Sequence, residues 1–142
     1  IRGCGPVGYP GSAEVVNMQP PAELIKKGVD TLPTMGDGRQ SGTAASPSIL
    51  NISPESAVGG NLALLETGDS IRVDLNTCSV QLQVSDAELA RRRAAYTPPK
   101  LEHQTPWQEI YRGCVGQLVT GGCLELATKY RGVGGCVPRR NH

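Results

Sequence analysis

The stretch Gly36-Asp37-Gly38-Arg39-Gln40-Ser41-Gly42-Thr43 is the sequence around which the rest of the chain is organised. It combines an acid, a base and a hydroxyl nucleophile with three glycines. Because glycine lacks a Cβ, it allows unusual backbone conformations and the close approach of a substrate. Polar loops on rigid scaffolds often carry function, but an ordinary surface turn is also built from Gly, Asp and Ser. The composition of the stretch leaves both interpretations open.

The composition of the whole chain indicates one loop-rich globular domain. The 142 residues include 18 Gly and 11 Pro but no Phe, which predicts a modest core. The hydrophobic fraction of 38% is typical of a globular rather than a disordered chain. A net charge of +1 gives no basic surface for nucleic acid, and no apolar run approaches the roughly 18 residues of a membrane span. We expect a cytoplasmic protein and, since the sequence begins at Ile1, a piece of a longer one.

The cysteines indicate neither a disulfide framework nor a zinc site. Their number is odd, their spacing is uneven, and no Cys-x-x-Cys pair is present. The two histidines, His103 and His142, lie far apart in the sequence, which argues against a zinc site within the chain. We therefore expect reduced thiols at Cys4, Cys78, Cys114, Cys123 and Cys136.

Residues 3–8 match the dinucleotide-binding pattern G-x-G-x-x-G, but we reject that function. The pattern requires a helix that begins within it, with its N-terminus on the pyrophosphate. Pro6, Gly8 and Pro10 all oppose such a helix. The segment is predicted to be a glycine-proline loop that leads to the first carboxylate of the chain, Glu14. On its own, Glu14 has the pattern of a surface acid or of an acid near a helix N-terminus.

Residues 71–75 and 80–84 form the clearest structural pattern. Apolar and polar residues alternate in both, which predicts two half-buried strands. The four residues between them suit a hairpin loop. Shorter elements are predicted as a helix over residues 20–28 and strands over residues 29–35 and 49–52.

Two helix starts are marked by capping sequences. Ser85 and Glu88 have the spacing of a reciprocal capping box for a helix that ends near residue 96. Thr105, followed by proline and by a glutamine three positions later, predicts a second helix that extends to residue 118. The first helix is expected to expose Arg91, Arg92 and Arg93 to solvent. Nucleic-acid binding by these arginines is disfavoured by the neutral total charge.

Several long motifs resemble the dihydroxy-acid dehydratase / 6-phosphogluconate dehydratase family. They are Arg2-Gly3-Cys4-Gly5-Pro6-Val7-Gly8-Tyr9-Pro10-Gly11 with Glu14, residues 36–43, Pro54-Glu55 with Gly59-Gly60, and a Pro-Arg-x-Asn-His terminus in which Arg140 replaces the usual Asp. Two further stretches look most like the sugar-acid branch, and within it the xylonate dehydratases: Gln104-Thr105-Pro106-Trp107-Gln108-Glu109 and Val115-Gly116-Gln117-Leu118.

The resemblance implies a fold and a place in a larger protein. Residues 1–142 would be the C-terminal domain, without its first strands, and the N-terminal cluster-binding domain would lie outside this chain. The implied fold is mixed α/β and β-rich, a β-barrel-like swivelling β/β/α domain with flanking helices. The family uses a 2Fe-2S cluster, whose ligands would be outside this chain, and Mg²⁺. A homodimer or homotetramer is expected.

The resemblance also implies a reaction and its residues. The family dehydrates 2,3-dihydroxy acids, here a sugar acid such as xylonate, to 2-keto-3-deoxy acids. Glu14 falls on a Mg²⁺ ligand, Ser41 on the catalytic serine, and Thr43 and His142 on substrate-binding positions, while Arg39 is expected to brace the loop. Dehydration in branched-chain amino-acid synthesis and a non-catalytic swivelling or interaction domain stay open. A serine hydrolase is disfavoured because glycine follows Ser41 directly, unlike in G-x-S-x-G.

Overall fold

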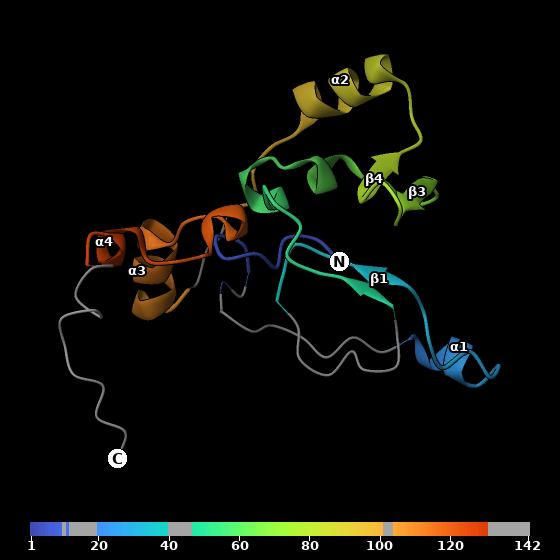
Figure 1. Cartoon of the computed structure of the whole chain (residues 1–142), viewed down its shortest axis with the longest axis horizontal. Helices are drawn as coiled ribbons and strands as arrows, with labels where there is room; N and C mark the ends of the chain where they lie inside the picture. Colours follow the sequence, from blue (N-terminus) through green and yellow to red (C-terminus); the bar gives the residue numbers. More distant parts are fainter. Residues whose placement is uncertain (10, 12–19, 40–46, 101–103, 131–142) are drawn as a thin grey trace.

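A computed structural model of the chain describes residues 1–9, 11, 20–39, 47–100 and 104–130. In this part, helices and two small sheets surround an irregular centre that contains the N-terminal loop (Figure 1). The α-helices are α1 (Ala22–Ile25), α2 (Asp86–Ala95), α3 (Pro106–Cys114) and α4 (Glu125–Thr128). The strands are β1 (Thr34–Met35), β2 (Ser48–Ile49), β3 (Ile71–Asp74) and β4 (Ser79–Leu82). Three 3₁₀ helices are η1 (Ser56–Val58), η2 (Asn61–Leu64) and η3 (Leu118–Thr120).

Strands β1 and β2 pair in parallel. The glycine loop follows β1 directly, and β2 comes after that loop in the sequence. Thr34 lies opposite Ser48, and their hydroxyl groups are 2.9 Å apart. Beyond the two strands the pairing continues, because Gly36 N–H donates to the Ile49 carbonyl and the Gly36 carbonyl accepts from Ile52 N–H. Strands were predicted over residues 29–35 and 49–52, but β1 and β2 have only 2 residues each. The first residues of the loop are nevertheless fixed to β2.

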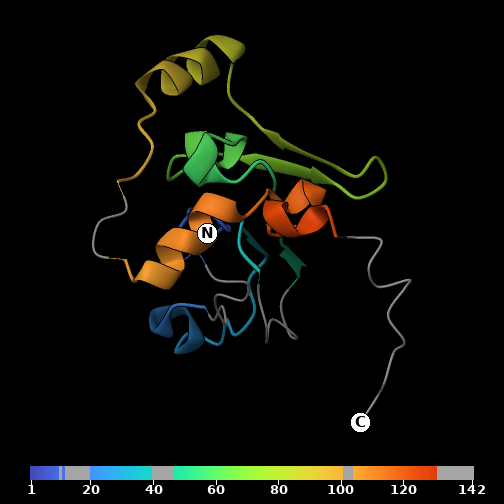
Figure 2. The same ribbon diagram turned by 90° about the vertical axis from the view of Figure 1, so that its left-hand side faces the viewer.

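The predicted pairing of the hairpin is confirmed, but its predicted half-burial is wrong, because Val73 and Val80 are 42% and 47% exposed. Strands β3 and β4 are antiparallel, with Ile71 opposite Leu82 and Asp74 opposite Ser79. The Asp74 carboxylate accepts hydrogen bonds from the next backbone N–H groups of the turn, which is the common way for aspartate to stabilise a turn. Figure 2 shows the hairpin beside η2, with α2 and α1 at opposite ends of the molecule.

Both predicted helix starts are present, but they differ in detail. Thr105 and Gln108 form the complete reciprocal capping box of α3. At α2, Ser85 accepts from the backbone of Glu88, but the Glu88 carboxylate does not return the bond. It accepts from Arg91 and Arg92 instead. Helix α3 also ends at Cys114, earlier than predicted, because the following valine pairs with Leu124 in an antiparallel bridge.

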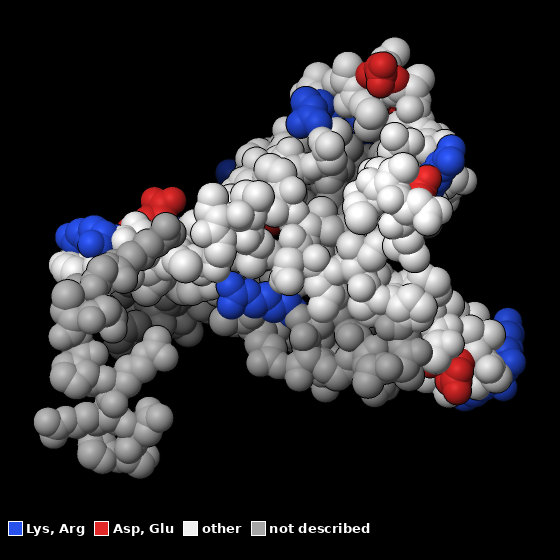
Figure 3. Space-filling view, in the orientation of Figure 1, with Lys and Arg blue, Asp and Glu red and all other residues white. Residues whose placement is uncertain are grey.

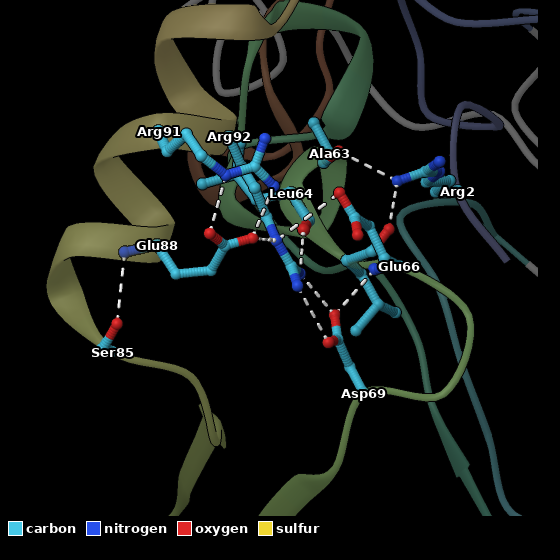
Figure 4. Close-up of polar contacts among 10 residues, drawn as sticks. Arg2, Ala63, Leu64, Glu66, Asp69, Ser85, Glu88, Arg91 and Arg92 are labelled. Atoms are coloured by element: carbon cyan, nitrogen blue, oxygen red, sulfur yellow. Dashed lines mark hydrogen bonds and ion pairs between the residues drawn. The ribbon is translucent and has the colours of Figure 1, made fainter.

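Arg92 was expected to be solvated, and this prediction is wrong. Its side chain is only 9% exposed and reaches from α2 to the turn after η2 (Figure 4). It binds Asp69 through both Nη atoms, at 2.6 and 3.1 Å, and Glu88 through Nε at 2.7 Å. It also donates to the Leu64 carbonyl at 2.9 Å. A fork of five N–H donors makes such simultaneous contacts possible, so Arg92 attaches α2 to the rest of the fold.

The mixed α/β class is confirmed, whereas the barrel is not seen. Each described strand has one strand partner, and the two sheets are separate. The described residues therefore form no closed barrel, which needs partners on both edges of every strand.

A groove of about 700 Å³ lies between β2, η2 and the hairpin. Apolar side chains on its walls include Met35, Ile49, Leu62, Ile71, Leu82 and Leu89. In the described part of the chain, no helix is both long and apolar enough to span a membrane.

The core is small, and its largest fully buried side chains are carboxylates. The buried apolar side chains are those of Ala57, Leu62, Leu64 and Val115. Asp37 and Glu55 are both 0% exposed. On the face shown in Figure 3, charged side chains lie in separate places on the surface and not in one patch. Among the described residues, the buried carboxylates are therefore the unusual electrostatic feature, and they contact the segments that lead to Glu14 and Ser41.

Candidate functional site

The four predicted site residues lie outside the described residues. These are Glu14, Ser41, Thr43 and His142. The structure describes the two segments that lead to the first two of them, residues 3–9 and 36–39. These segments are far apart in the sequence but are in direct contact in the fold, and the buried carboxylate of Asp37 makes the contact.

Asp37 joins the glycine loop to the N-terminal loop. Its Oδ2 accepts from the backbone N–H of Gly3 at 3.0 Å, and its Oδ1 accepts from that of Cys4 at 3.1 Å. Oδ2 also accepts from the backbone N–H of Ser56 at 2.8 Å and from its hydroxyl at 2.7 Å. One carboxylate therefore fixes three segments of the chain.

The hydrogen bonds keep Asp37 ionised in spite of its burial. Burial acts to raise the pKa of the Asp37 carboxyl, but the donors on Ser56, Gly3 and Cys4 outweigh it, so that its pKa lies below the ordinary value. The pKa of the Cys4 thiol is raised by its own burial and by the charge of Asp37. The site therefore holds a negative carboxylate beside a protonated thiol.

Glu55 joins the next residues of the N-terminal loop to the C-terminal part of the chain. Its Oε1 accepts from Val7 N–H at 2.8 Å, and its Oε2 accepts from Gly8 N–H at 3.1 Å. Gln117, just before η3, donates its amide to Glu55 Oε1 at 2.8 Å and accepts from Glu55 N–H at 3.0 Å. The reciprocal pair with Gln117 fixes both the backbone and the side chain of Glu55.

The close contacts of these loops explain two of the glycines. A Cβ on Gly5 would lie 2.0 Å from Glu55 Oε2, and a Cβ on Gly8 would lie 2.2 Å from the Gly3 carbonyl oxygen. Both distances are far below van der Waals contact, so any side chain at these positions would displace the loop or the carboxylate. Gly5 is therefore required by packing against Glu55, and Gly8 by the close approach of the Gly3 backbone.

Residues 1–122 match the model of the family described as "Dihydroxy-acid/6-phosphogluconate dehydratase C-terminal". The match covers most of the chain and includes both buried carboxylates. The chain belongs to this dehydratase family. The resemblance that the sequence motifs indicated is confirmed.

Individual dehydratases match over nearly the whole chain. D-xylonate dehydratase of Caulobacter vibrioides is 60% identical over 142 residues, which are 100% of this chain and 24% of that protein. L-arabinonate dehydratase of Rhizobium leguminosarum bv. trifolii is 47% identical over 93% of this chain and 23% of its own length. Dihydroxy-acid dehydratase of Clostridium beijerinckii is 39% identical over 89% of this chain and 22% of its own length. The chain thus spans about a quarter of the length of these dehydratases.

The described part of the dehydratase chain does not by itself form a metal site. Within it, no three His, Cys, Asp or Glu side chains lie together in a group that could bind a metal ion. The oxygen atoms of Asp37 and Glu55 are already occupied as hydrogen-bond acceptors, so these carboxylates do not fit the role of metal ligands. Cys4, Cys78, Cys114 and Cys123 are free thiols, as predicted, and Cys136 lies outside the described residues.

Two arginines hold loops of the site region in contact with other segments: Arg112 contacts the N-terminal loop, and Arg39, in the glycine loop, contacts Gly122. Arg112 on α3 donates from Nε to the Gly8 carbonyl at 3.0 Å, and its two Nη atoms are buried without a hydrogen-bond partner. The guanidinium group of Arg39 lies so close to Gly122 that a Cβ there would be 2.5 Å from Nη2. The bracing role of Arg39 stays a prediction.

The sequence interpretation missed the roles of Asp37, Glu55 and Gln117. One signal was present for Asp37, because an acid between Gly36 and Gly38 is flanked by residues that permit close backbone approach. The partners of Glu55 are about 47 and 62 positions away in the sequence, so no local pattern indicated them.

Proposed function

We propose that the protein to which this chain belongs is a hydro-lyase that dehydrates a sugar acid, an aldonate such as xylonate, to its 2-keto-3-deoxy acid. The observation that carries the proposal is the 60% identity to a D-xylonate dehydratase over the full chain, against 39% to a dihydroxy-acid dehydratase. On the same grounds we rank dehydration in branched-chain amino-acid synthesis second.

In this proposal the chain is the C-terminal domain, and further strands come from the longer protein. The groove lined by Met35, Ile49 and Leu82 supports this, because an apolar surface of this kind is normally covered. Added strands would complete the β-barrel-like swivelling domain that the family resemblance implies. A homodimer or homotetramer is part of the same proposal, and the mass of the full-length protein in solution tests it.

Ser41 is proposed to remove the proton from C2 of the substrate. The C2–H electrons then form the C2–C3 double bond, the C3–O bond breaks, and the 3-hydroxyl leaves as water after it gains a proton. The enol product tautomerises to the 2-keto acid. A serine is a weak base at neutral pH, so Ser41 acts only where positive charge nearby stabilises its alkoxide. A proton-transfer group in this position contributes roughly 10²–10⁴-fold in rate.

Glu14, Thr43 and His142 are proposed to organise the reactants. Glu14 offers a carboxylate oxygen, the ligand type that Mg²⁺ prefers. The Thr43 hydroxyl donates to the substrate carboxylate, and His142 contacts the substrate. Mg²⁺ and the 2Fe-2S cluster, when bound, supply Lewis acidity to the substrate oxygen atoms. The cluster ligands belong to the part of the protein outside this chain.

The experiment is a substrate comparison with the full-length, cofactor-loaded protein. Formation of a 2-keto acid is measured with xylonate, arabinonate and a branched-chain 2,3-dihydroxy acid. We expect the highest kcat/KM with a sugar acid. A preference for the branched-chain acid would move the protein to the second function. No product from any of the three, in a protein that contains cluster and Mg²⁺, would favour the non-catalytic domain.

A further inference from the structure

We propose that Asp37 and Glu55 are positioning residues, which hold the segment leading to Glu14 and the segment leading to Ser41 in one fixed arrangement. The inference rests on the proposed function, because it concerns the metal ligand and the base of that reaction. It assigns a role to two buried carboxylates that have no part in the chemistry itself.

Asp37 is the direct link between the two segments. It lies four positions before Ser41, and its carboxylate binds the backbone of Gly3 and Cys4 in the segment that precedes Glu14. Its own backbone is held by the neighbouring Gly36, which donates to Ile49 of β2 at 3.0 Å and accepts from Ile52, just after β2, at 3.1 Å. The N-terminal segment is therefore fixed to a part of the loop that is itself anchored.

Glu55 supplies the second point of attachment, a few residues further along the same segment. It binds the backbone N–H groups of Val7 and Gly8, while Arg112 binds the carbonyl of Gly8. One attachment alone would let the segment rotate about it. Two attachments, at residues 3–4 and 7–8, fix both its place and its direction.

Both residues need to be carboxylates for this task. Asp37 accepts four hydrogen bonds and donates none, and each of its oxygen atoms is used. An amide at position 37 would turn an N–H₂ group toward N–H or O–H donors and leave buried groups unpaired. Leaving such groups unpaired is expensive, whereas a charge with several donors is accommodated well inside a protein.

The consequence for catalysis is geometric. A displacement of about 1 Å between reacting groups can lower a rate by roughly 100-fold, even when the changed residue is distant from the chemistry. Loss of the Asp37 contacts would allow displacement of this kind between Glu14 and Ser41. Binding of Mg²⁺ and turnover would then both suffer.

The test compares Asp37→Asn with Asp69→Asn in the full-length protein. Asp69 is a suitable control because its carboxylate also accepts several hydrogen bonds, from Arg92 and the Glu66 backbone, but it attaches α2 (Figure 4). For Asp37→Asn we expect a fall in kcat of roughly 100-fold and a higher Mg²⁺ concentration for half-maximal activity. For Asp69→Asn we expect neither change. Ser56→Ala removes one of the four bonds to Asp37 and should have a smaller effect in the same direction.

A second measurement does not depend on activity. Hydrogen exchange of the metal-free full-length protein should become faster in residues 1–9 and also in residues 36–43 for Asp37→Asn, and only around α2 for Asp69→Asn. The inference is overturned if Asp37→Asn keeps wild-type kcat and Mg²⁺ dependence, or if only residues 1–9 exchange faster. If the wild-type protein dehydrates no sugar acid, the proposed function fails, and coupled exchange still decides whether Asp37 holds the two segments together.

Discussion

Individual carboxylates of this chain differ in their roles. Asp37 and Glu55 are buried and their oxygen atoms accept hydrogen bonds from the backbone, so they stabilise loops. Glu14 follows a loop that is rich in glycine and proline and is the carboxylate proposed to bind Mg²⁺. Ser41, which follows Asp37 in the same glycine loop, is the group proposed to move the proton. These assignments give two predictions at the level of residues.

The first prediction concerns Ser41→Ala in the full-length protein. Turnover should fall by roughly 10²–10⁴-fold, because a positioned proton-transfer group is lost. Cluster and Mg²⁺ content should not change, and the free energy of unfolding should fall by no more than about 1 kcal/mol, typical of one lost hydrogen bond. Ser79→Ala, at the start of β4, is the control and should have wild-type turnover. A Ser41→Ala protein that retains more than about a tenth of its rate contradicts the role as base.

The second prediction concerns Glu14→Gln. Replacement of one anionic oxygen by an amide should raise the Mg²⁺ concentration needed for half-maximal activity, while the visible absorption of the cluster stays the same. Glu23→Gln makes the same chemical change in the first turn of α1 and should have no effect. An identical Mg²⁺ titration for both variants would make Glu14 a surface acid.

Among the elements, α2 is attached mainly by charge. Glu88 binds Arg91 and Arg92 on its own helix, and Arg92 continues to Asp69 in the turn after η2 (Figure 4). Hydrogen bonds from these two arginines lower the pKa of Glu88 from 4.5 to about 2. No residue of α2 is fully buried, so the ion pairs contribute more to its attachment than they would in a helix packed on a core.

This attachment predicts a dependence of stability on pH. Because the pKa of Glu88 is lower in the folded protein than in the unfolded chain, its stabilising effect is complete above about pH 4.5 and is lost as the pH falls toward 2. The denaturant midpoint of Glu88→Gln should therefore be lower than that of wild type at neutral pH, and the difference should shrink between pH 4.5 and 2. Glu23→Gln is the control. A difference that does not change over this range would contradict the ion-pair attachment.

Local patterns predicted some elements well and failed where distant residues decide the structure. The β3–β4 hairpin and the starts of α2 and α3 were predicted, because alternation and capping depend on neighbours in the sequence. The early end of α3 was not, since Val115 leaves the helix to pair with Leu124. The exposure of Arg92 was predicted incorrectly because its partner Asp69 lies 23 positions away. For the candidate site, the sequence indicated the glycine loop that contains Asp37. It did not indicate that Asp37 and Glu55 accept the hydrogen bonds that fix the N-terminal loop.

The whole molecule shows large apolar side chains at its surface. Trp107 on α3 is 80% exposed and Leu75 in the hairpin turn is 82% exposed. The chain also corresponds to about a quarter of the length of the dehydratases that it matches. Both facts agree with a domain that functions as part of a larger protein, in which the cluster is proposed to be bound by residues elsewhere.

This arrangement predicts how the thiols behave. Replacement of each of the five cysteines by serine, one at a time in the full-length protein, should leave the visible absorption of the cluster unchanged. The four described cysteines are free and belong to no group suited to a metal, and Cys136 has no partner at ligand spacing in the sequence. Circular dichroism of each variant serves as the control for folding. Loss of colour in a variant that is correctly folded would assign that cysteine to the cluster.

The hydrogen bonds of the N-terminal loop also determine the order in which the protein can assemble. Gly3, Cys4, Val7 and Gly8 bind carboxylates that lie 33 to 48 positions later in the sequence. During synthesis these residues leave the ribosome well before their acceptors. Glu55 is likewise made before its own partner Gln117, which lies 62 positions further on. Contacts between such distant positions form late, because a long loop has to close first. The loop that leads to Glu14 is therefore among the earliest parts of this chain to be made and among the last to take its shape.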